Sequence, residues 1–164
     1  MTKNISYEFF TKKGTLMHGN YLGIGTGGSL YTYNRNHNSD HNEPGIEQKI
    51  LNVLEDLKNS VPGMKGAALA SSDGLPMATA FSLEVNKELI CAMAAALYNT
   101  GTRVGNMLKL KNFKSTTIEL ENGLILISNV KNAVLLAFME ANGNLGLAKL
   151  KMPKVCEKIE KILF

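Results

Sequence analysis

The glycines of residues 23–28, in the sequence GIGTGG, have the spacing of a dinucleotide-binding loop. Gly23, Gly25 and Gly28 match G-x-G-x-x-G, which lets a backbone approach a pyrophosphate when a strand precedes the loop and a helix follows it. Here the strand-like sequence SLYTY and then a polar stretch follow Gly28, so no helix N-terminus is available to a phosphate. The pattern therefore indicates a turn. Since G-x-x-x-x-G-K-S/T is also absent from the sequence, we expect no nucleotide cofactor.

Two other groups of polar residues have types that could do chemistry. His37 and His41, with Asp40 beside them, have the spacing of a metal-binding pair, but they lie in a polar linker without an obvious fourth ligand. The Ser-Ser-Asp sequence at residues 71–73 has no histidine nearby and no surrounding G-x-S-x-G, so it indicates a turn. We expect no metal, no cofactor and no enzymatic activity, because no acid, base and nucleophile come together.

The composition is that of a globular domain with a mildly basic surface. Of the 164 residues, 45% are hydrophobic, and the net charge of +4 is too small for the basic stripe of a nucleic-acid-binding protein. Cys91 and Cys156 are far apart, which indicates free buried thiols in a reducing compartment. No signal-peptide pattern is visible, and the most apolar run, residues 89–98, is about half of the ~20 residues that cross a bilayer. We expect a soluble cytoplasmic protein that neither inserts into membranes nor binds nucleic acid.

Residues 1–43 and residues 44–164 differ in character. The first segment contains NISYEFFT, TLMHGNYLGIG and SLYTYN, three short sequences that are rich in aromatic or β-branched residues and separated by turn-like sequences. It ends in the polar linker NRNHNSDHNEPG at residues 34–45. We expect an N-terminal extension that is β-rich or flexible, followed by one domain over residues 44–164.

The second segment alternates helical and strand patterns. Pro44 suits the start of a helix whose apolar residues recur at helical spacing over residues 46–57. A hairpin around residues 71–74, a helix over about residues 86–110 and a hairpin turning at Asn122-Gly123 follow. A further strand and an amphipathic helix, which Pro153 either starts or kinks, close the chain. The sequence predicts an α/β (α+β) fold of order α-β-β-α-β-β-β-α, in which helices cover both faces of a five-stranded antiparallel sheet.

The helix expected at residues 86–110 carries two apolar stripes. One stripe consists mainly of large residues, and we expect it to face the sheet of its own subunit: Ile90, Met93, Ala94, Leu97, Val104 and Leu108. The other stripe consists mostly of small residues, spaced by three and four positions: Cys91, Ala95, Tyr98, Thr102 and Gly105.

Four sequence motifs, in this order, are similar to those of a known family. They are VPGMKGAALASSDGLPMAT (residues 61–79), AMAAAL (residues 92–97) followed by Gly101 and Arg103, IELENGLILI (residues 118–127), and NLGLAKLKM (residues 144–152). Together they resemble the Roadblock domain of the dynein light chain and Ras-like GTPase-regulator superfamily, over about residues 46–163. The resemblance does not extend to residues 1–43.

The resemblance implies a three-layer fold and a non-enzymatic scaffold. Roadblock proteins pair by aligning the second helix and the third strand of two subunits into one continuous sheet. The pairing surface would include the small-residue stripe, Cys91, Ala95, Tyr98, Thr102 and Gly105, together with Thr116, Ile118 and Leu120 on the strand. Small residues allow two helices to approach closely, and an unpaired strand edge can form hydrogen bonds with a strand of another chain. Both features are consistent with the pairing surface that the resemblance implies.

The resemblance also indicates a partner. Prokaryotic Roadblock proteins bind or stimulate small Ras-like GTPases, so we expect a homodimer that binds such a GTPase and modulates its nucleotide cycle. A purely structural adaptor in a larger motor-like or membrane-associated assembly is the alternative. The residues expected to contact a partner lie on the polar flank of the second helix: Glu88, Asn99, Arg103 and Asn106. For Arg103, an ordinary surface role remains equally open.

The last helix carries a row of lysines opposite its apolar face: Lys151, Lys154, Lys158 and Lys161. Such a row is typical of a solvated helix face, and binding to anionic lipid or nucleic acid remains the alternative.

Overall fold

The computed structural model describes residues 5–10, 16–21 and 43–164 of a chain that forms two compact units, residues 1–42 and 43–164. In the first unit, β1 (Ile5–Phe10) and β2 (Leu16–Tyr21) form an antiparallel hairpin. This hairpin confirms two of the three strands expected in the N-terminal segment. The third strand-like sequence, the glycines of residues 23–28 and the histidine pair His37 and His41 lie outside the described residues.

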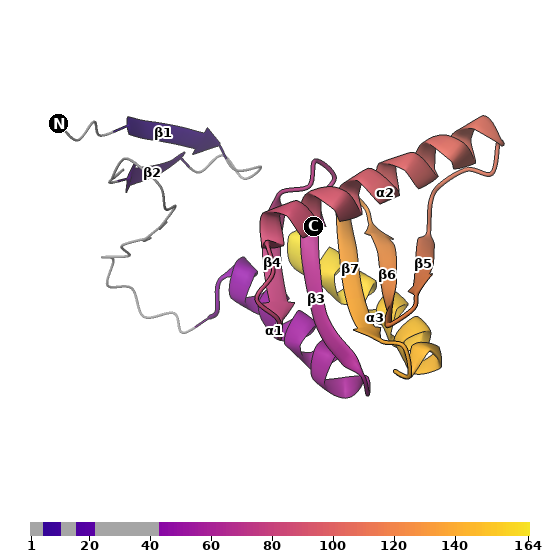
Figure 1. The fold of residues 1–164 in the computed structure, drawn as a ribbon. Coiled ribbons are helices and arrows are strands. Elements are labelled where there is room, and N and C mark those ends of the chain that lie inside the picture. The colour runs from indigo at the N-terminus through magenta and orange to yellow at the C-terminus, as the bar shows by residue number, and fades with distance from the viewer. Residues whose placement is uncertain (1–4, 11–15, 22–42) are drawn as a thin grey trace. The chain divides into compact units, whose positions relative to one another are not determined.

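The second unit has the element order and the sheet that the sequence predicts (Figure 1). Its elements are α1 (Ile46–Ser60), β3 (Met64–Ser71), β4 (Pro76–Phe81), α2 (Lys87–Met107), β5 (Ser115–Leu120), β6 (Gly123–Val130), β7 (Ala133–Glu140) and α3 (Leu145–Leu163). The strands lie in the order β4-β3-β7-β6-β5, and every neighbouring pair is antiparallel. The predicted α+β fold class is confirmed, and β5 lies at an edge of the sheet.

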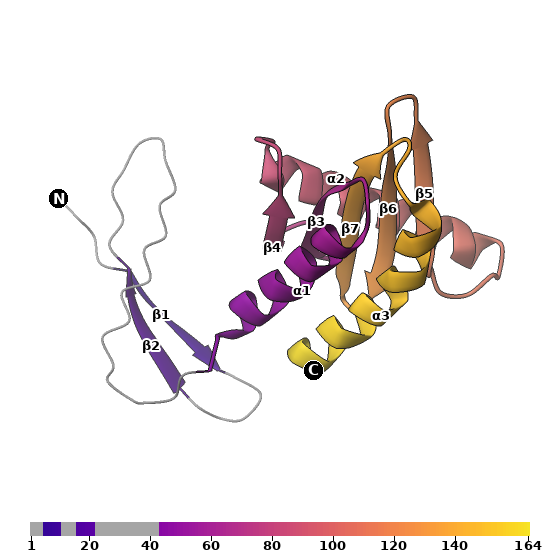
Figure 2. The same cartoon turned by 90° about the horizontal axis from the view of Figure 1, so that it is seen from below.

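The helices form layers on the two faces of the sheet (Figure 2). α1 and α3 cover one face and enclose the larger apolar core, whereas α2 crosses the other face over a smaller cluster. Along β7, Leu135 and Ala137 point into the larger core, and Val134 and Leu136 point toward α2. Because both faces of the central strands are covered, these strands are apolar nearly throughout, as the sequence suggested.

The turns differ from the expected turns by small shifts. Leu120 pairs with Gly123, so the β5–β6 turn consists of residues 121–122, one residue before the expected Asn122-Gly123 pair. A side chain at Gly123 would place its Cβ only 2.8 Å from the carbonyl oxygen of Met139, which explains a glycine at the start of β6. Residues 71–74 form the turn that the sequence predicts, with Gly74 at a φ of 88°.

The helix ends also refine the sequence-based boundaries. α2 stops at Met107, three residues earlier than expected, and the chain then passes through Lys109 and Lys111 at φ values of 57° and 67°. Asn144 caps α3, because its side chain accepts a hydrogen bond from the backbone N–H of Leu147. Pro153 therefore lies inside a helix that began at Leu145, which settles the open alternative. No helix in the described ranges is long and apolar enough to cross a membrane.

Candidate self-association and partner-binding surface

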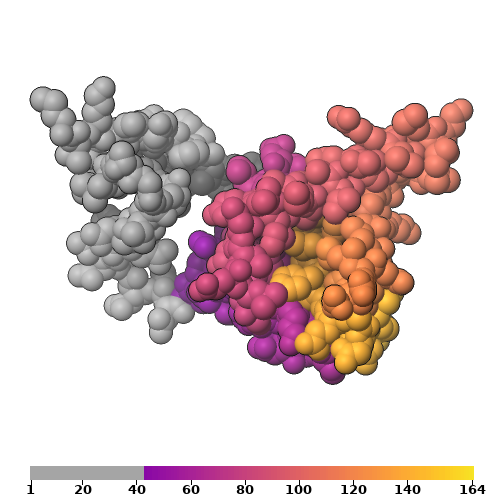
Figure 3. Space-filling model, viewed as in Figure 1, coloured from indigo at the N-terminus to yellow at the C-terminus, as the bar shows by residue number. Residues whose placement is uncertain are grey.

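α2 begins at a well-defined cap. The side chain of Asn86 accepts a hydrogen bond from the backbone N–H of Leu89 at 2.9 Å, as the sequence predicts for an N-cap. From there α2 crosses the sheet as a ridge and projects beyond β5 (Figures 1 and 3). This placement leaves one side of α2 against the sheet and another side open.

The side against the sheet is a buried stripe of mostly small residues: Cys91, Ala94, Ala95 and Tyr98. Cys91 and Ala95 are only 0% and 3% exposed, and Cys91 packs against Ala68 and Ala70 of β3. Ala94 and Tyr98 belong to the cluster formed with β6 and β7. Small side chains let the helix lie close to the strands beneath it. The expectation that Cys91 and Ala95 form an intermolecular surface is therefore wrong.

The remaining members of the expected small-residue surface also have contacts within their own subunit. The rings of Tyr98 and Phe113 meet edge to face at a centroid distance of 5.4 Å. Thr102 is half-buried, and its hydroxyl donates a hydrogen bond to the carbonyl oxygen of Tyr98. A Cβ at Gly105 would lie 3.2 Å from the carbonyl oxygen of Lys111, so Gly105 fits the returning chain closely. Tyr98 and Gly105 thus contact the segment after α2, and the participation of Tyr98, Thr102 and Gly105 in pairing stays a prediction.

The open side of α2 is an exposed stripe of large apolar residues: Leu89, Met93, Leu97, Val104, Met107 and Leu108. Met93 is 59% exposed and Leu97 is 42% exposed. Most of the stripe that was expected to face its own sheet therefore faces solvent, and that expectation is wrong for Met93, Leu97, Val104 and Leu108. It holds for Ala94, which is buried, and for half-buried Ile90, which packs on the same cluster.

The edge strand β5 is the strand beyond which α2 projects (Figure 1). β5 pairs only with β6, so its other edge is open within the described part of the chain. Thr116 and Ile118 are half-buried, and Ile118 packs on the cluster beneath α2. Leu120 is exposed at the end of the strand. The participation of Thr116, Ile118 and Leu120 in pairing stays a prediction, with a geometry that permits it.

An apolar groove lies between the start of α2 and the lower end of β5. Its volume is about 850 Å³. Its apolar lining comes from separate elements: Leu83, Val85, Ile90, Leu120, Ile125 and Phe138. Charged side chains also line it: Glu121 is exposed, and Lys65 and Glu140 form an ion pair at 2.8 Å. Only the folded sheet brings these side chains together, which is why the sequence did not reveal the groove.

The expected partner-binding residues lie on the exposed flank of α2. Glu88, Asn99, Arg103 and Asn106 are all exposed. The side-chain amide of Asn99 donates a hydrogen bond to the carbonyl oxygen of Ser72, so Asn99 also fixes the β3–β4 turn. None of the ion pairs found between described residues includes Arg103. The four residues thus share one accessible side, and their function as a contact surface stays a prediction.

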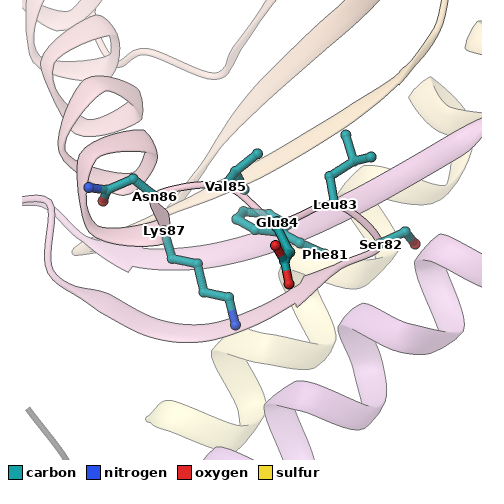
Figure 4. Close-up of a pocket in the computed structure, with 7 residues that line it drawn as sticks. All are labelled: Phe81, Ser82, Leu83, Glu84, Val85, Asn86 and Lys87. Atoms are coloured by element: carbon teal, nitrogen blue, oxygen red, sulfur yellow. The ribbon is translucent and has the colours of Figure 1, made fainter. Parts of the chain in front are cut away.

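A second, shallower hollow lies beside the loop that joins β4 to α2. It is lined by residues 81–87 and has a volume of about 570 Å³. Figure 4 shows that the side chains of Glu84 and Lys87 extend to the same side of this loop. The lining contains neither a histidine nor a thiol that could act with them. Its polar groups include the Ser82 hydroxyl, the Glu84 carboxylate and the Lys87 ammonium, and none of the ion pairs between described residues joins Glu84 to Lys87.

The two cysteines are free and buried, as the sequence suggested. Burial raises the pKa of the Cys91 thiol, and the carboxylate of Glu88 adds to the shift. Burial, with a contribution from Glu160, raises the pKa of Cys156 to about 11. Both groups are therefore protonated thiols near neutral pH. Across the described ranges, no three His, Cys, Asp or Glu side chains form a group that could hold a metal ion.

Comparisons with known proteins identify the family. The model of the Roadblock/LC7 domain matches residues 50–139. An uncharacterized protein of Methanocaldococcus jannaschii, MJ0714, is 32% identical over 115 residues, which cover 70% of this chain and 97% of that protein.

Two solved structures share the fold. A Roadblock/LC7 domain from Streptomyces avermitilis has a TM-score of 0.65 and 19% identity, covering 69% of this chain and 96% of that one. MglB of Myxococcus xanthus has a TM-score of 0.66 and 17% identity, covering 82% of this chain and 94% of that one. From the matched residues and the shared architecture together, the chain belongs to the Roadblock/LC7 domain family.

Proposed function

We propose that this protein is a cytoplasmic, non-enzymatic homodimer that serves as a scaffold for a small Ras-like GTPase and modulates its nucleotide cycle. The observation that carries the proposal is the exposed stripe of α2, a helix that projects beyond the open edge strand β5 (Figure 1). Contiguous exposed apolar surface marks an interaction site, and an open strand edge accepts another strand. Membership of the Roadblock/LC7 family supports the same mode of pairing.

The topology suggests how two copies would meet. Antiparallel pairing of β5 with β5 would join the two sheets into one and place a two-fold axis between the strands. This rotation would turn α2 end for end, so the two α2 helices would run antiparallel on the same face. Because α2 projects beyond β5 (Figure 1), its C-terminal end would lie over the sheet of the partner subunit.

The projecting end of α2 and the apolar groove have matching chemistry. Met107, Leu108 and Leu110 are 62–82% exposed, and the groove offers apolar side chains of similar character. Lys109 and Lys111 follow the helix, and the exposed carboxylate of Glu121 lines the groove. In a two-fold dimer each copy would contribute one projecting end and one groove. Two equivalent contacts would then form, and each would cover one projecting end and one groove. Stable dimers bury roughly 1,200–2,000 Å² or more, and this double contact provides a route to such an area.

The GTPase would bind the polar flank of the paired helices. Arg103 is exposed beside the exposed stripe, and dimerisation would bring two copies of the polar flank with Glu88, Asn99 and Asn106 onto one platform. Charged and polar groups at an interface contribute mainly to its specificity and to the rate of association. The support for a GTPase as the partner comes from the Roadblock family, in which binding to Ras-like GTPases is expected for prokaryotic members.

The test is a pull-down with purified small GTPases from the same organism, each loaded with GDP or a GTP analogue. The full-length protein should retain at least one GTPase, and Arg103→Ala should retain about tenfold less, in line with the loss of an interfacial charge. Lys149→Ala, on the opposite face of the sheet, is the control and should bind normally. A dimer that retains no GTPase would refute the regulatory function and leave the structural adaptor as the explanation of the fold.

A further inference from the structure

The face opposite α2 contains a second groove, between α1 and α3. α1 and α3 lie side by side on this face (Figure 2). The groove has a volume of about 580 Å³, which is within the range of natural ligand sites. Val53, Leu57 and Leu147 contribute apolar surface, and Leu150, which is 62% exposed, stands on its α3 wall. The groove is therefore an apolar channel that is open to solvent.

The charges around this groove are strongly unequal. Lys151, Lys154 and Lys158 line its α3 wall, and Asp56 is the one carboxylate among the lining residues. None of the ion pairs between residues of the described ranges includes any of these three lysines. The groove therefore combines an apolar floor with an excess of positive charge, three lysines against one carboxylate.

The charges of α3 are also sorted between its two flanks. Glu157 and Glu160 line a different cleft, beside β5, on the other flank of the helix, together with Lys149. Lys151, Lys154 and Lys158 thus face the α1 side, apart from these two carboxylates. A helix stabilised by its own salt bridges would carry both charges on the same side. This segregation creates a positive field along the groove that favours an anionic occupant.

We propose that the groove between α1 and α3 binds an acidic amphipathic segment of a partner protein. Apolar side chains of that segment insert between Leu147 and Leu150, and its carboxylates face Lys151, Lys154 and Lys158. A concave channel between two helices accepts a helix or an extended chain, whereas a bilayer is too broad to enter it. The N-terminal segment of this same chain is a poor occupant, because residues 1–42 contain four basic and only two acidic residues.

The position of the groove gives it a separate function from the α2 surface. The groove lies across the sheet from α2, so it stays open when α2 and β5 are covered by a second copy. This inference does not depend on the proposed dimer or on a GTPase. A scaffold with both surfaces holds one partner on each face of the sheet.

The probe is a synthetic 18-residue helix-forming peptide that carries a leucine stripe flanked by glutamates. Fluorescence anisotropy with the full-length protein should show micromolar binding that weakens as salt is raised. Lys154→Glu should weaken the binding by about tenfold or more, and Leu150→Ser should weaken it by a similar factor. The matched control is Lys149→Glu, which makes the same charge change on the other flank of α3 and should leave the binding unchanged.

Three results would overturn the inference. The first is equal binding of a second peptide in which lysines replace the glutamates. The second is an equal loss of binding in Lys149→Glu and Lys154→Glu, because the protein's overall charge would then account for the effect. The third is Lys154-dependent sedimentation with phosphatidylserine–phosphatidylcholine vesicles in the absence of peptide binding, because a membrane surface would then be the occupant. Circular dichroism of every variant verifies that the fold is retained.

Discussion

The two apolar sides of α2 have opposite environments although they belong to the same helix. The buried stripe of Cys91, Ala94, Ala95 and Tyr98 packs on the sheet, whereas the exposed stripe, with Met93 and Leu97 at its centre, faces solvent. The side chains that touch the sheet are mostly small, and those that face away are large. Helix–sheet packing therefore uses the small residues for close approach and leaves the large residues exposed to solvent.

This difference gives a rule for helices that cover a sheet and also pair between subunits. A stripe of small residues can pack closely against any neighbouring surface, and the sheet of the same subunit is such a surface. Large apolar residues that remain exposed on an otherwise folded domain cost free energy in water, which a second copy recovers by covering them. The stripe with the larger side chains is therefore the better candidate for the intermolecular contact.

The largest effect is expected from a charge in the buried stripe. Ala95→Glu places a carboxylate at a position that is only 3% exposed. We expect a loss of about 3 to 5 kcal/mol in the free energy of unfolding, a large part of the total stability of a small domain. Urea denaturation followed by circular dichroism measures this loss. Ala96→Glu, on the adjacent exposed residue, should change the unfolding midpoint little; equal losses would mean that the burial difference is not real.

A cysteine accessibility experiment compares the two stripes directly. Cys91 should react with a thiol reagent only when the protein unfolds, because it is fully buried and its pKa is raised. A cysteine introduced by Leu97→Cys should react at least about 100-fold faster in dilute, monomeric protein, and its rate should fall as the protein concentration rises and pairing covers it. A Leu97→Cys rate that is independent of concentration would argue against pairing through this stripe.

Alkaline pH should lower the free energy of unfolding through the Cys91 thiol of the buried stripe. The pKa of Cys91 in the folded protein lies above its ordinary value of 9.0. Unfolding therefore allows the thiol to lose its proton at a lower pH, so the free energy of unfolding should fall as pH rises above about 9. Chemical denaturation at pH 8 and at pH 10 measures the fall. Cys91→Ala, which removes the titrating group, should show a smaller fall; an identical pH dependence would show that Cys91 does not contribute.

The smallest effect is expected from removal of the N-terminal segment. A chain that starts at Asn42 retains every element from α1 to α3 and both apolar stripes of α2. Its unfolding midpoint and its state of association should match those of the full-length protein, as thermal denaturation and light scattering can show. Aggregation of the shortened chain would indicate that residues 1–41 cover an apolar surface of the domain.

The sequence was sufficient for the order of elements but not for the orientation of α2. Apolar periodicity, the Asn86 cap and the turn glycines predicted the helices and the antiparallel sheet, because these signals are local. The two stripes of α2 both have helical spacing, so periodicity could not tell which one touches the strands. That choice depends on the small residues beneath the helix, Ala68 and Ala70, which become neighbours of Cys91 only after folding.

The sequence did not predict the two grooves, for the same reason. The lining of the groove below α2 draws on residues as far apart as Leu83 and Phe138, and that of the lysine-walled groove joins Val53 to Lys158. The sequence showed the row of lysines, but it did not show which residues of other elements would lie beside them. Its position beside α1 is a property of the packed helices.

The most direct test of the central claim is the state of association of Leu97→Glu, measured by sedimentation equilibrium. The wild-type protein should be a dimer, and a carboxylate in the centre of the exposed stripe should weaken association by about a hundredfold or more. The variant should then sediment as a monomer with native circular dichroism and an unchanged unfolding midpoint at low concentration. Leu150→Glu, the same substitution at an exposed leucine on the opposite face, should remain a dimer. A Leu97→Glu protein that stays dimeric at micromolar concentration would contradict the assignment of the exposed stripe as the pairing surface.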